Sequence, residues 1–437
     1  MRLTSRGLAE RTYGSAMFER WANSLAKSTT ERWCWRFMEA ISGSPNVIVV
    51  LTTQWRGQAT GYAGDGNANT PFLDSLVESA VDCYQAVTPH PFGVFARAAF
   101  LTGVGCPDNG VRDYYDPLPR DTRTWAHRFG EAGYQSAFFG KWQLYDRDPH
   151  ASVVGEAHAR IEVPRDRRGG FEFWQGFESG FLLNDGFYHG DGIGAPVKIP
   201  GYQSDVLVDN AIDFMDTRSG DRPLFAVLSL DAPHPPYGEP ASDVAPRPFE
   251  SISLDLEVPP DPSIREIAQR ELSGYYGHIE ATDRSIGRLV RRIQESGEWE
   301  NTIFAFTSVH GDMHGSGGYF RKGWPHEQSI RIPMLISWPR IFTEGRRDPL
   351  LVSLLDLGPT LGGLALDHSW GSSMGERRGA DLSAALRLQA PGPERQWISM
   401  PSVPPFAKQC PYIWEGERTV GKTIGRKENG TVFSLDH

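Results

Sequence analysis

The chain has 437 residues and a formal net charge of −10, and 39% of its residues are hydrophobic. This balance is typical of a folded globular protein, and the acidic excess argues against sequence-independent nucleic-acid binding. No apolar run approaches the ~18 residues that predict a membrane span, and the spacing of the cysteines favours isolated reduced thiols over a disulfide framework or a zinc site.

Residues 1–44 are predicted to form a helical N-terminal extension. In this segment charged side chains interrupt every short apolar stretch, as in "MFERWANSLAKSTTERWCWRFMEAI". A secretory leader needs an unbroken apolar core, so a cytoplasmic location is expected. Packing of the extension against the rest of the protein is favoured over binding to a partner or a membrane.

Beyond residue 44 the pattern alternates between strands and helices. "NVIVVLTT" (46–53) is a continuous apolar run that predicts a buried strand, and "NTPFLDSLVESAVDCYQAV" (69–87) predicts a helix. Further along the chain, helices are predicted within 96–103, 124–132, 205–218, 271–297 and 352–365, and strands within 134–142, 223–230, 302–308 and 333–339.

Strands that alternate with helices predict an α/β fold, with a mostly parallel sheet and helices on both faces. Ligands of such sheets lie beyond the carboxyl ends of the strands. The loops after Leu51, Phe139, Leu230 and Phe306 are therefore expected to converge. We assign residues 45–370 to this core and residues 371–437, which are rich in Gly, Pro and Arg, to a small C-terminal α+β subdomain.

Several segments of these loops resemble the sulfatases of the alkaline-phosphatase superfamily. In family order they are "NVIVVLTTQWRG", "NTPFLDSL", "ARAAFLTG", "WAHRFGEAGYQSAFFGKW", "APHPPY", "YYGHIEATDRSIGRL", "TSVHGDMHG", "KGWPHEQSIRIPMLISWP" and "DLGPTLGGLA". The resemblance extends from Pro45 to the C-terminus. It implies a sulfatase-like fold and, in active relatives, hydrolysis of sulfate esters.

The resemblance also identifies the position of the nucleophile. Active members use a Cys or Ser in a C/S-x-P-x-R motif, which is converted to formylglycine. Alignment on Arg97 places Gly93 at the nucleophile and Phe95 at the proline. Glycine has no side chain with which to attack. The acid/base His of the family's G-K-W-H loop is replaced by Gln143, which does not exchange a proton near neutral pH.

The metal positions implied by the resemblance are also altered. Relatives hold a divalent cation, usually calcium, between acidic residues after the first strand and after a late strand. The corresponding residues here are Thr53, Gln54, Val309 and His310. Calcium requires several oxygen ligands that include carboxylates. We therefore expect no cofactor, and calcium only if these four positions are not the metal site.

Four residues match those that contact the sulfate oxygens in relatives: Arg97, Lys141, His234 and Lys322. Helix-cap, surface or structural roles are the alternatives, but the motif context favours an anion pocket. Having lost the metal-binding carboxylates, the cations are expected to lie without buried counter-charge and to favour an anion. The resemblance implies a structural role for Asp312, and neither it nor His314 or His326 is assigned a catalytic role. Cys106 is expected to be a buried, inert thiol.

Two functional hypotheses remain. The favoured one is a sulfatase-like protein that has lost ester hydrolysis. It would bind a sulfate or phosphate ester or a sulfated sugar, or would act as a partner subunit of an intact sulfatase or of a second copy. The alternative is an active sulfuric or phosphoric ester hydrolase, or a fold recruited to other chemistry, with a rebuilt site.

Overall fold

The protein is represented by a computed structural model that describes residues 43–366, 377–406 and 408–437. The predicted N-terminal extension, apart from its last two residues, lies outside this range, and so does the predicted boundary at residue 371. Among the helices described, none is long and apolar enough to cross a membrane.

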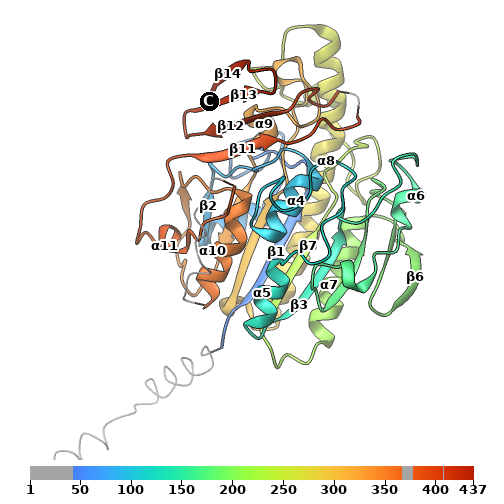
Figure 1. Cartoon of the computed structure of the whole chain (residues 1–437), viewed down its shortest axis with the longest axis vertical. Helices are drawn as coiled ribbons and strands as arrows, with labels where there is room; N and C mark the ends of the chain where they lie inside the picture. Colours follow the sequence, from blue (N-terminus) through green and yellow to red (C-terminus); the bar gives the residue numbers. More distant parts are fainter. Residues whose placement is uncertain (1–42, 367–376, 407) are drawn as a thin grey trace, which may run out of the picture. The chain divides into compact units, whose positions relative to one another are not determined.

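The described core is built on one large sheet (Figure 1). Its centre, from β8 through β1, β7 and β3 to β4, is parallel, whereas β9 runs antiparallel to both β8 and β2. From one edge to the other the strands are β10 (Arg346–Asp348), β2 (Ala80–Cys83), β9 (Met334–Ser337), β8 (Thr302–Ser308), β1 (Asn46–Thr52), β7 (Leu224–Ser229), β3 (Gln135–Lys141), β4 (Phe173–Phe177), β5 (Phe187–Gly190) and β6 (Ile193–Lys198).

Helices cover both faces of the sheet. The α-helices of the described residues are α3 (Pro71–Leu76), α4 (Gly93–Thr102), α5 (Trp125–Glu131), α6 (Glu156–Ala159), α7 (Gln203–Thr217), α8 (Pro262–Glu295), α9 (Glu327–Ile330), α10 (Leu354–Leu366) and α11 (Ser383–Leu386). Because successive side chains of a strand point to opposite faces, β1 contributes to two hydrophobic clusters. Val47, Val49 and Leu51 join the cluster that contains α4 and α10 residues. Ile48 and Val50 join the cluster that contains α7 and α8 residues.

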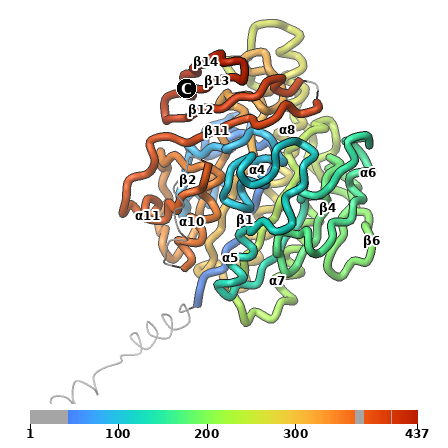
Figure 2. Tube along the Cα trace, in the orientation of Figure 1, coloured from blue at the N-terminus to red at the C-terminus, as the bar shows by residue number. Residues whose placement is uncertain are grey.

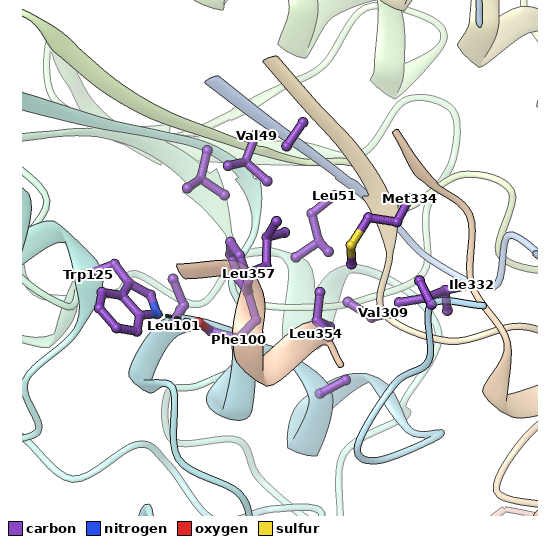
Figure 3. Packing of buried hydrophobic residues seen from close by; sticks show 14 of the residues in the cluster. Val49, Leu51, Phe100, Leu101, Trp125, Val309, Ile332, Met334, Leu354 and Leu357 are labelled. Atoms are coloured by element: carbon purple, nitrogen blue, oxygen red, sulfur yellow. Dashed lines mark hydrogen bonds between the residues drawn. The ribbon is translucent and has the colours of Figure 1, made fainter. Parts of the chain in front are cut away.

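Because β1 is buried on both faces by these two clusters, its side chains are apolar along nearly the whole strand, and the predicted buried strand is confirmed. Figure 3 shows part of the first cluster, to which Leu51 of β1, Met334 of β9, and Leu354 and Leu357 of α10 all belong. The predicted α/β class, with a mostly parallel sheet between helices, is therefore confirmed.

One predicted helix is wrong over much of its length. The segment 69–87 was expected to be helical throughout, but α3 ends at Leu76 and residues 80–83 form β2. Val81 and Cys83 are fully buried, and β2 pairs with both β9 and β10. Tertiary pairing thus overrides the helical spacing of the local sequence. Strands β4, β5 and β6 were not predicted at all.

The C-terminal residues form a separate antiparallel sheet, as expected for a small subdomain. Its strands are β11 (Gln396–Met400), β12 (Trp414–Arg418), β13 (Lys422–Lys427) and β14 (Val432–Asp436), paired in that order. The tube view shows these red strands beside the blue segment that precedes α4 (Figure 2). The Ser399 backbone N–H donates to Pro89 O at 2.8 Å, which joins this sheet to the core.

Candidate functional site

The loops after the four central strands converge at one end of the sheet, as the sequence predicted. They border a cavity of about 660 Å³ whose lining includes Thr53, Lys141, His234 and His310, one from each loop. Each of these follows or ends a parallel strand, so the sheet itself brings them together. Gly93, Gln143 and Lys322 also line this first cavity.

Gly93 is the first residue of α4, and its surroundings are filled. A Cβ atom built on Gly93 would lie 2.8 Å from Gln143 Oε1 and 2.9 Å from Arg97 Nη1. Both distances are below normal van der Waals contact, so a side chain here would have to displace one of these groups. The space that a nucleophile would need is taken by a hydrogen bond from Arg97 to Gln143, 3.2 Å long.

The Arg97 guanidinium is committed to neighbouring protein groups. It donates to Thr53 Oγ1 at 2.8 Å and to Gln143 Oε1, and it approaches Ser229 Oγ at 3.4 Å. Arg97 is buried and is not among the residues that line the first cavity. Burial lowers the pKa of Arg97 to about 10. Direct contact between Arg97 and an anion therefore stays a prediction.

The Lys141 side chain forms a buried ion pair that the sequence analysis did not expect. Its ammonium lies 2.8 Å from Asp231 Oδ1, and both side chains are almost completely removed from solvent. The expectation that the cations lie without buried counter-charge is wrong, because Asp231, two residues after β7, supplies one. Burial lowers the pKa of Lys141 to about 8, against the opposing effect of Asp231. Asp231 Oδ2 is buried and has no hydrogen-bond partner among the described residues.

Lys322 lies at the centre of a second polar group. Its Nζ donates to Gln54 Oε1 and lies 2.9 Å from His234 Nε2. His234 Nδ1 lies 2.7 Å from Pro235 O, which can only accept, so Nδ1 carries the proton and Nε2 accepts from Lys322. Burial lowers the pKa values of both Lys322 and His234. The neighbouring cations Lys322 and Lys141 lower the pKa of His234 further, and Lys141 also lowers that of Lys322, against the opposing effect of Asp312.

Asp312 anchors the far side of this group. Its Oδ2 accepts hydrogen bonds from Gln54 Nε2 and from the Tyr237 hydroxyl. Gln54 thereby bridges the Lys322 amine and the Asp312 carboxylate, and it holds a left-handed backbone with φ 67° to do so. The structural role expected for Asp312 agrees with these contacts.

The four positions that would hold a metal in relatives do not fit a hard cation. Both polar atoms of the Gln54 amide are engaged, and Thr53 Oγ1 donates to Leu230 O while it accepts from Arg97. Val309 belongs to the hydrophobic cluster of Figure 3. His310 Nδ1 lies 2.8 Å from Gly311 O, which leaves only Nε2 without a partner. No group of three or more His, Cys, Asp or Glu in the described ranges is placed to hold a metal ion.

A buried ion pair behind Gln143 was missed by the sequence analysis. Arg147 Nε lies 3.3 Å from Glu178 Oε1, and both side chains are fully buried. Glu178 also accepts from the backbone N–H groups of Leu144 and Tyr145, and its own carbonyl accepts from Gln143 N–H at 2.9 Å. The pair thus fixes the loop that carries Gln143. Neither residue lies in a family motif, and the only sequence signal is the charge itself next to aromatic residues.

The walls of the first cavity are mostly aromatic and apolar. Phe181 covers one side, where its ring stacks on His234 with 4.4 Å between ring centroids and lies 4.1 Å from Lys141 Nζ. Other apolar lining residues are Phe92, Tyr114, Val153, Val154, Pro235, Pro236, Tyr237 and Phe406. The cavity therefore combines buried nitrogen-bearing side chains, which we call its floor, with mostly apolar walls.

Other residues noted in the sequence lie elsewhere. His326 and His314 do not line the first cavity, and His314 is buried against Tyr237 and Tyr275. Cys106 is buried, and burial raises the pKa of its thiol to about 12, which agrees with an inert residue.

Comparison with known proteins gives a consistent result. The sulfatase family model matches residues 45–368. An ulvan-active sulfatase of Formosa agariphila is 33% identical over 406 residues, which cover 90% of this chain and 75% of that protein.

Two solved structures share the fold. A putative sulfatase of Bacteroides fragilis has a TM-score of 0.76 at 22% identity and covers 90% of this chain and 89% of its own. A structure described as a complex with its substrate, D-glucosamine-2-N,6-O-disulfate, has a TM-score of 0.70 at 20% identity and covers 90% and 91% of the two chains. By its sequence, the order of its motifs and its fold, this chain belongs to the sulfatase family.

Proposed function

We propose that this sulfatase-family protein binds an anionic ester in the first cavity without hydrolysing it. The observation that carries the proposal is Gly93. The position has no nucleophilic atom, and the space for one is occupied by the Arg97–Gln143 hydrogen bond. A catalyst of this family would need both the nucleophile and room for its hydrated aldehyde beside the sulfate group.

The hydroxyl groups that line the first cavity do not replace the missing nucleophile. Thr53 Oγ1 donates to Leu230 O and accepts from Arg97, so no base is placed to take its proton. The Tyr237 hydroxyl donates to Asp312, and burial raises its pKa well above the ordinary value. Burial also raises the pKa of the third hydroxyl, that of Tyr114. None of the three is activated in the way that nucleophilic catalysis requires.

The groups on the floor of the cavity are suited to hold an anion. Lys141 and Lys322 each have N–H donors, and His234 lies beside Lys322. In a buried site such donors interact strongly with a sulfate or phosphate oxygen. A sulfated sugar is the ligand class that we propose. The Formosa relative is named as active on ulvan, and one of the solved structures with this fold is described as a complex with a disulfated glucosamine.

A two-part experiment tests the proposal. Sodium sulfate and sodium chloride at matched ionic strength are compared in melting experiments, and turnover of 4-nitrophenyl sulfate and 4-nitrophenyl phosphate is measured in parallel. Sulfate alone should raise the melting temperature, since it binds the native state, and neither ester should be cleaved. Lys322→Ala should remove the sulfate effect, whereas Lys198→Gln, an exposed lysine outside the cavity, should retain it.

A hydrolytic activity toward either ester would instead establish the alternative, an active hydrolase with a rebuilt site. That activity must remain with the protein when it is purified to homogeneity, and it must be lost in Lys322→Ala. Equal effects of sulfate and chloride would remove the anion-binding proposal. Pairing with an intact sulfatase subunit or with a second copy stays a prediction. It can be checked by measuring the molar mass of the purified protein in solution, alone and mixed with such a sulfatase.

A further inference from the structure

A second cavity, of about 780 Å³, lies between the C-terminal sheet and the loop that contains Cys106. It shares no lining residue with the first cavity. Its ionisable lining consists of four cationic side chains, Arg112, Arg377, Arg426 and Lys427, and two carboxylates, Glu415 and Glu428. In a chain with a formal net charge of −10, this is a local excess of positive charge.

The two carboxylates do not neutralise all four cations. Glu415 lies 3.3 Å from Arg377 and 3.9 Å from Arg426, and Asp108 lies 3.4 Å from Arg377. Within the part of the chain that the structure describes, no ion pair involves Arg112 or Lys427. The Lys427 ammonium instead lies 3.9 Å from the centroid of the Tyr412 ring. Two cations of this cavity are thus available to a ligand.

An aromatic ring of fixed orientation lines the same cavity. Trp397, on β11, is half-buried, and its ring meets His90 edge-on at 5.2 Å while the Arg377 guanidinium lies 5.2 Å from its centroid. Gly105 passes so close that a Cβ there would lie 2.8 Å from the ring. The ring is therefore supported by protein on several sides and keeps a defined position.

We propose that the second cavity binds an acidic saccharide, with Arg112 and Lys427 contacting its sulfate or carboxylate groups and Trp397 packing against a sugar ring. Cations that lack an ion-pair partner favour an anionic ligand, and an indole offers a large apolar face with little loss of conformational entropy. A single-stranded nucleic acid is disfavoured, because such sites stack successive bases on several aromatic side chains. The site is independent of Gly93 and of the proposed function of the first cavity.

Isothermal titration calorimetry with a dextran sulfate oligosaccharide tests this proposal. Neutral dextran of the same length serves as the uncharged ligand. Wild-type protein should bind dextran sulfate but not dextran. Arg112→Gln with Lys427→Gln should weaken binding by about tenfold or more, the effect of losing charged hydrogen bonds.

Two further variants make the test specific. Arg395 is an exposed cation just before β11, the strand that contains Trp397, and it does not line the second cavity. Arg395→Gln should therefore leave the affinity for dextran sulfate within about twofold of wild type. Trp397→Phe keeps a ring and should bind more tightly than Trp397→Leu. Circular dichroism melts identify a variant that fails to fold, and because Arg112 is exposed its substitution should leave the melt unchanged.

The proposal is overturned if the Arg112 and Lys427 substitutions leave the affinity for dextran sulfate unchanged, or if Arg395→Gln weakens it equally. Binding of polyuridylate or polyglutamate with the same affinity and the same dependence on Arg112 and Lys427 would show a general polyanion site instead. Loss of dextran sulfate binding in Lys322→Ala would place the ligand in the first cavity.

Discussion

Lys141 Nζ lies 2.8 Å from Asp231 Oδ1, at a point where both side chains are excluded from solvent. Lys141 ends β3 and Asp231 lies two residues after β7, the adjacent parallel strand, so the sheet brings them together. A buried pair of this kind is costly to form but more costly to break, because the remaining charge has lost both its partner and its water. Asp231 therefore gives the floor of the first cavity its charge balance.

Substitution of Asp231 should show this directly. Asp231→Asn is expected to reduce the free energy of unfolding by about 3–5 kcal/mol, the usual cost of leaving one buried charge unpaired. The double variant Asp231→Asn with Lys141→Met removes both charges and should recover much of that loss. Urea unfolding measures all three proteins, and equal stability of the single and double variants would contradict the buried ion pair.

Sulfate affinity should depend on pH in a defined direction. The pKa of Lys141 is lowered from its ordinary value to about 8 by burial, so the free protein begins to lose this proton near neutral pH. A bound anion favours the charged form, hence binding takes up a proton whenever Lys141 starts neutral. Affinity should be flat below about pH 7 and should fall as the pH rises toward about 9.

Calorimetry of sulfate binding in two buffers with different ionisation enthalpies detects this proton uptake. A sulfate affinity that stays constant across that pH range would show that neither Lys141 nor the other buried amine changes its protonation on binding. In the absence of anion the lowered pKa has the opposite consequence for folding. The unfolded chain holds this proton more tightly, so the contribution of Lys141 to stability rises with pH from about 8 to the ordinary lysine value.

The packing around Gly93 can be tested by a double-mutant cycle. Gly93→Ala adds a Cβ within contact distance of Gln143 Oε1 and should destabilise the protein by about 1–3 kcal/mol, the usual effect of overpacking. In the Gln143→Ala background the added methyl group has more room, so the same change should cost less by about 1 kcal/mol. Additive effects in thermal unfolding would show that the two positions are independent.

Metal analysis gives a further test. Because Gln54 and Thr53 are engaged with protein groups and Val309 is apolar, purified protein should contain no stoichiometric calcium or magnesium. Chelator should leave the melting temperature unchanged. One tightly held ion per chain would mean that the metal lies elsewhere than at these positions.

Restoration of the nucleophile alone should not restore hydrolysis. Gly93→Cys with Phe95→Pro, co-expressed with a formylglycine-generating enzyme, is expected to give no aryl-sulfatase activity, since Thr53, Gln54 and Val309 do not fit the divalent cation that would orient the ester. Phe95 is fully buried, so its loss should itself cost about 3–5 kcal/mol. The smallest set that we expect to matter adds Thr53→Asp, Val309→Asp and Gln143→His. Turnover by the two-residue variant would show that the metal positions are wrongly assigned.

Much of the fold and part of the site could be predicted from the sequence. The apolar run of β1 fixes a central parallel strand, and the motif order indicates the family. The short strand β2 could not be predicted, because it is stabilised by pairing with β9 and β10, which lie far along the chain. The sequence shows an acidic residue, Asp231, shortly after β7, but nothing in its local sequence indicates that it pairs with Lys141.

The hydrogen bonds of the C-terminal segment have a consequence for synthesis of the protein. Ser399 pairs with Pro89, which lies shortly before α4, and the Lys322 backbone N–H donates to the side chain of Gln409. Both contacts join residues that lie far apart in the sequence, and such contacts form late in folding. A nascent chain can therefore build β1, α4 and β3 before the residues that support α4 and Lys322 have been synthesised. The first cavity is completed only after the segment that contains Ser399 and Gln409 has been added.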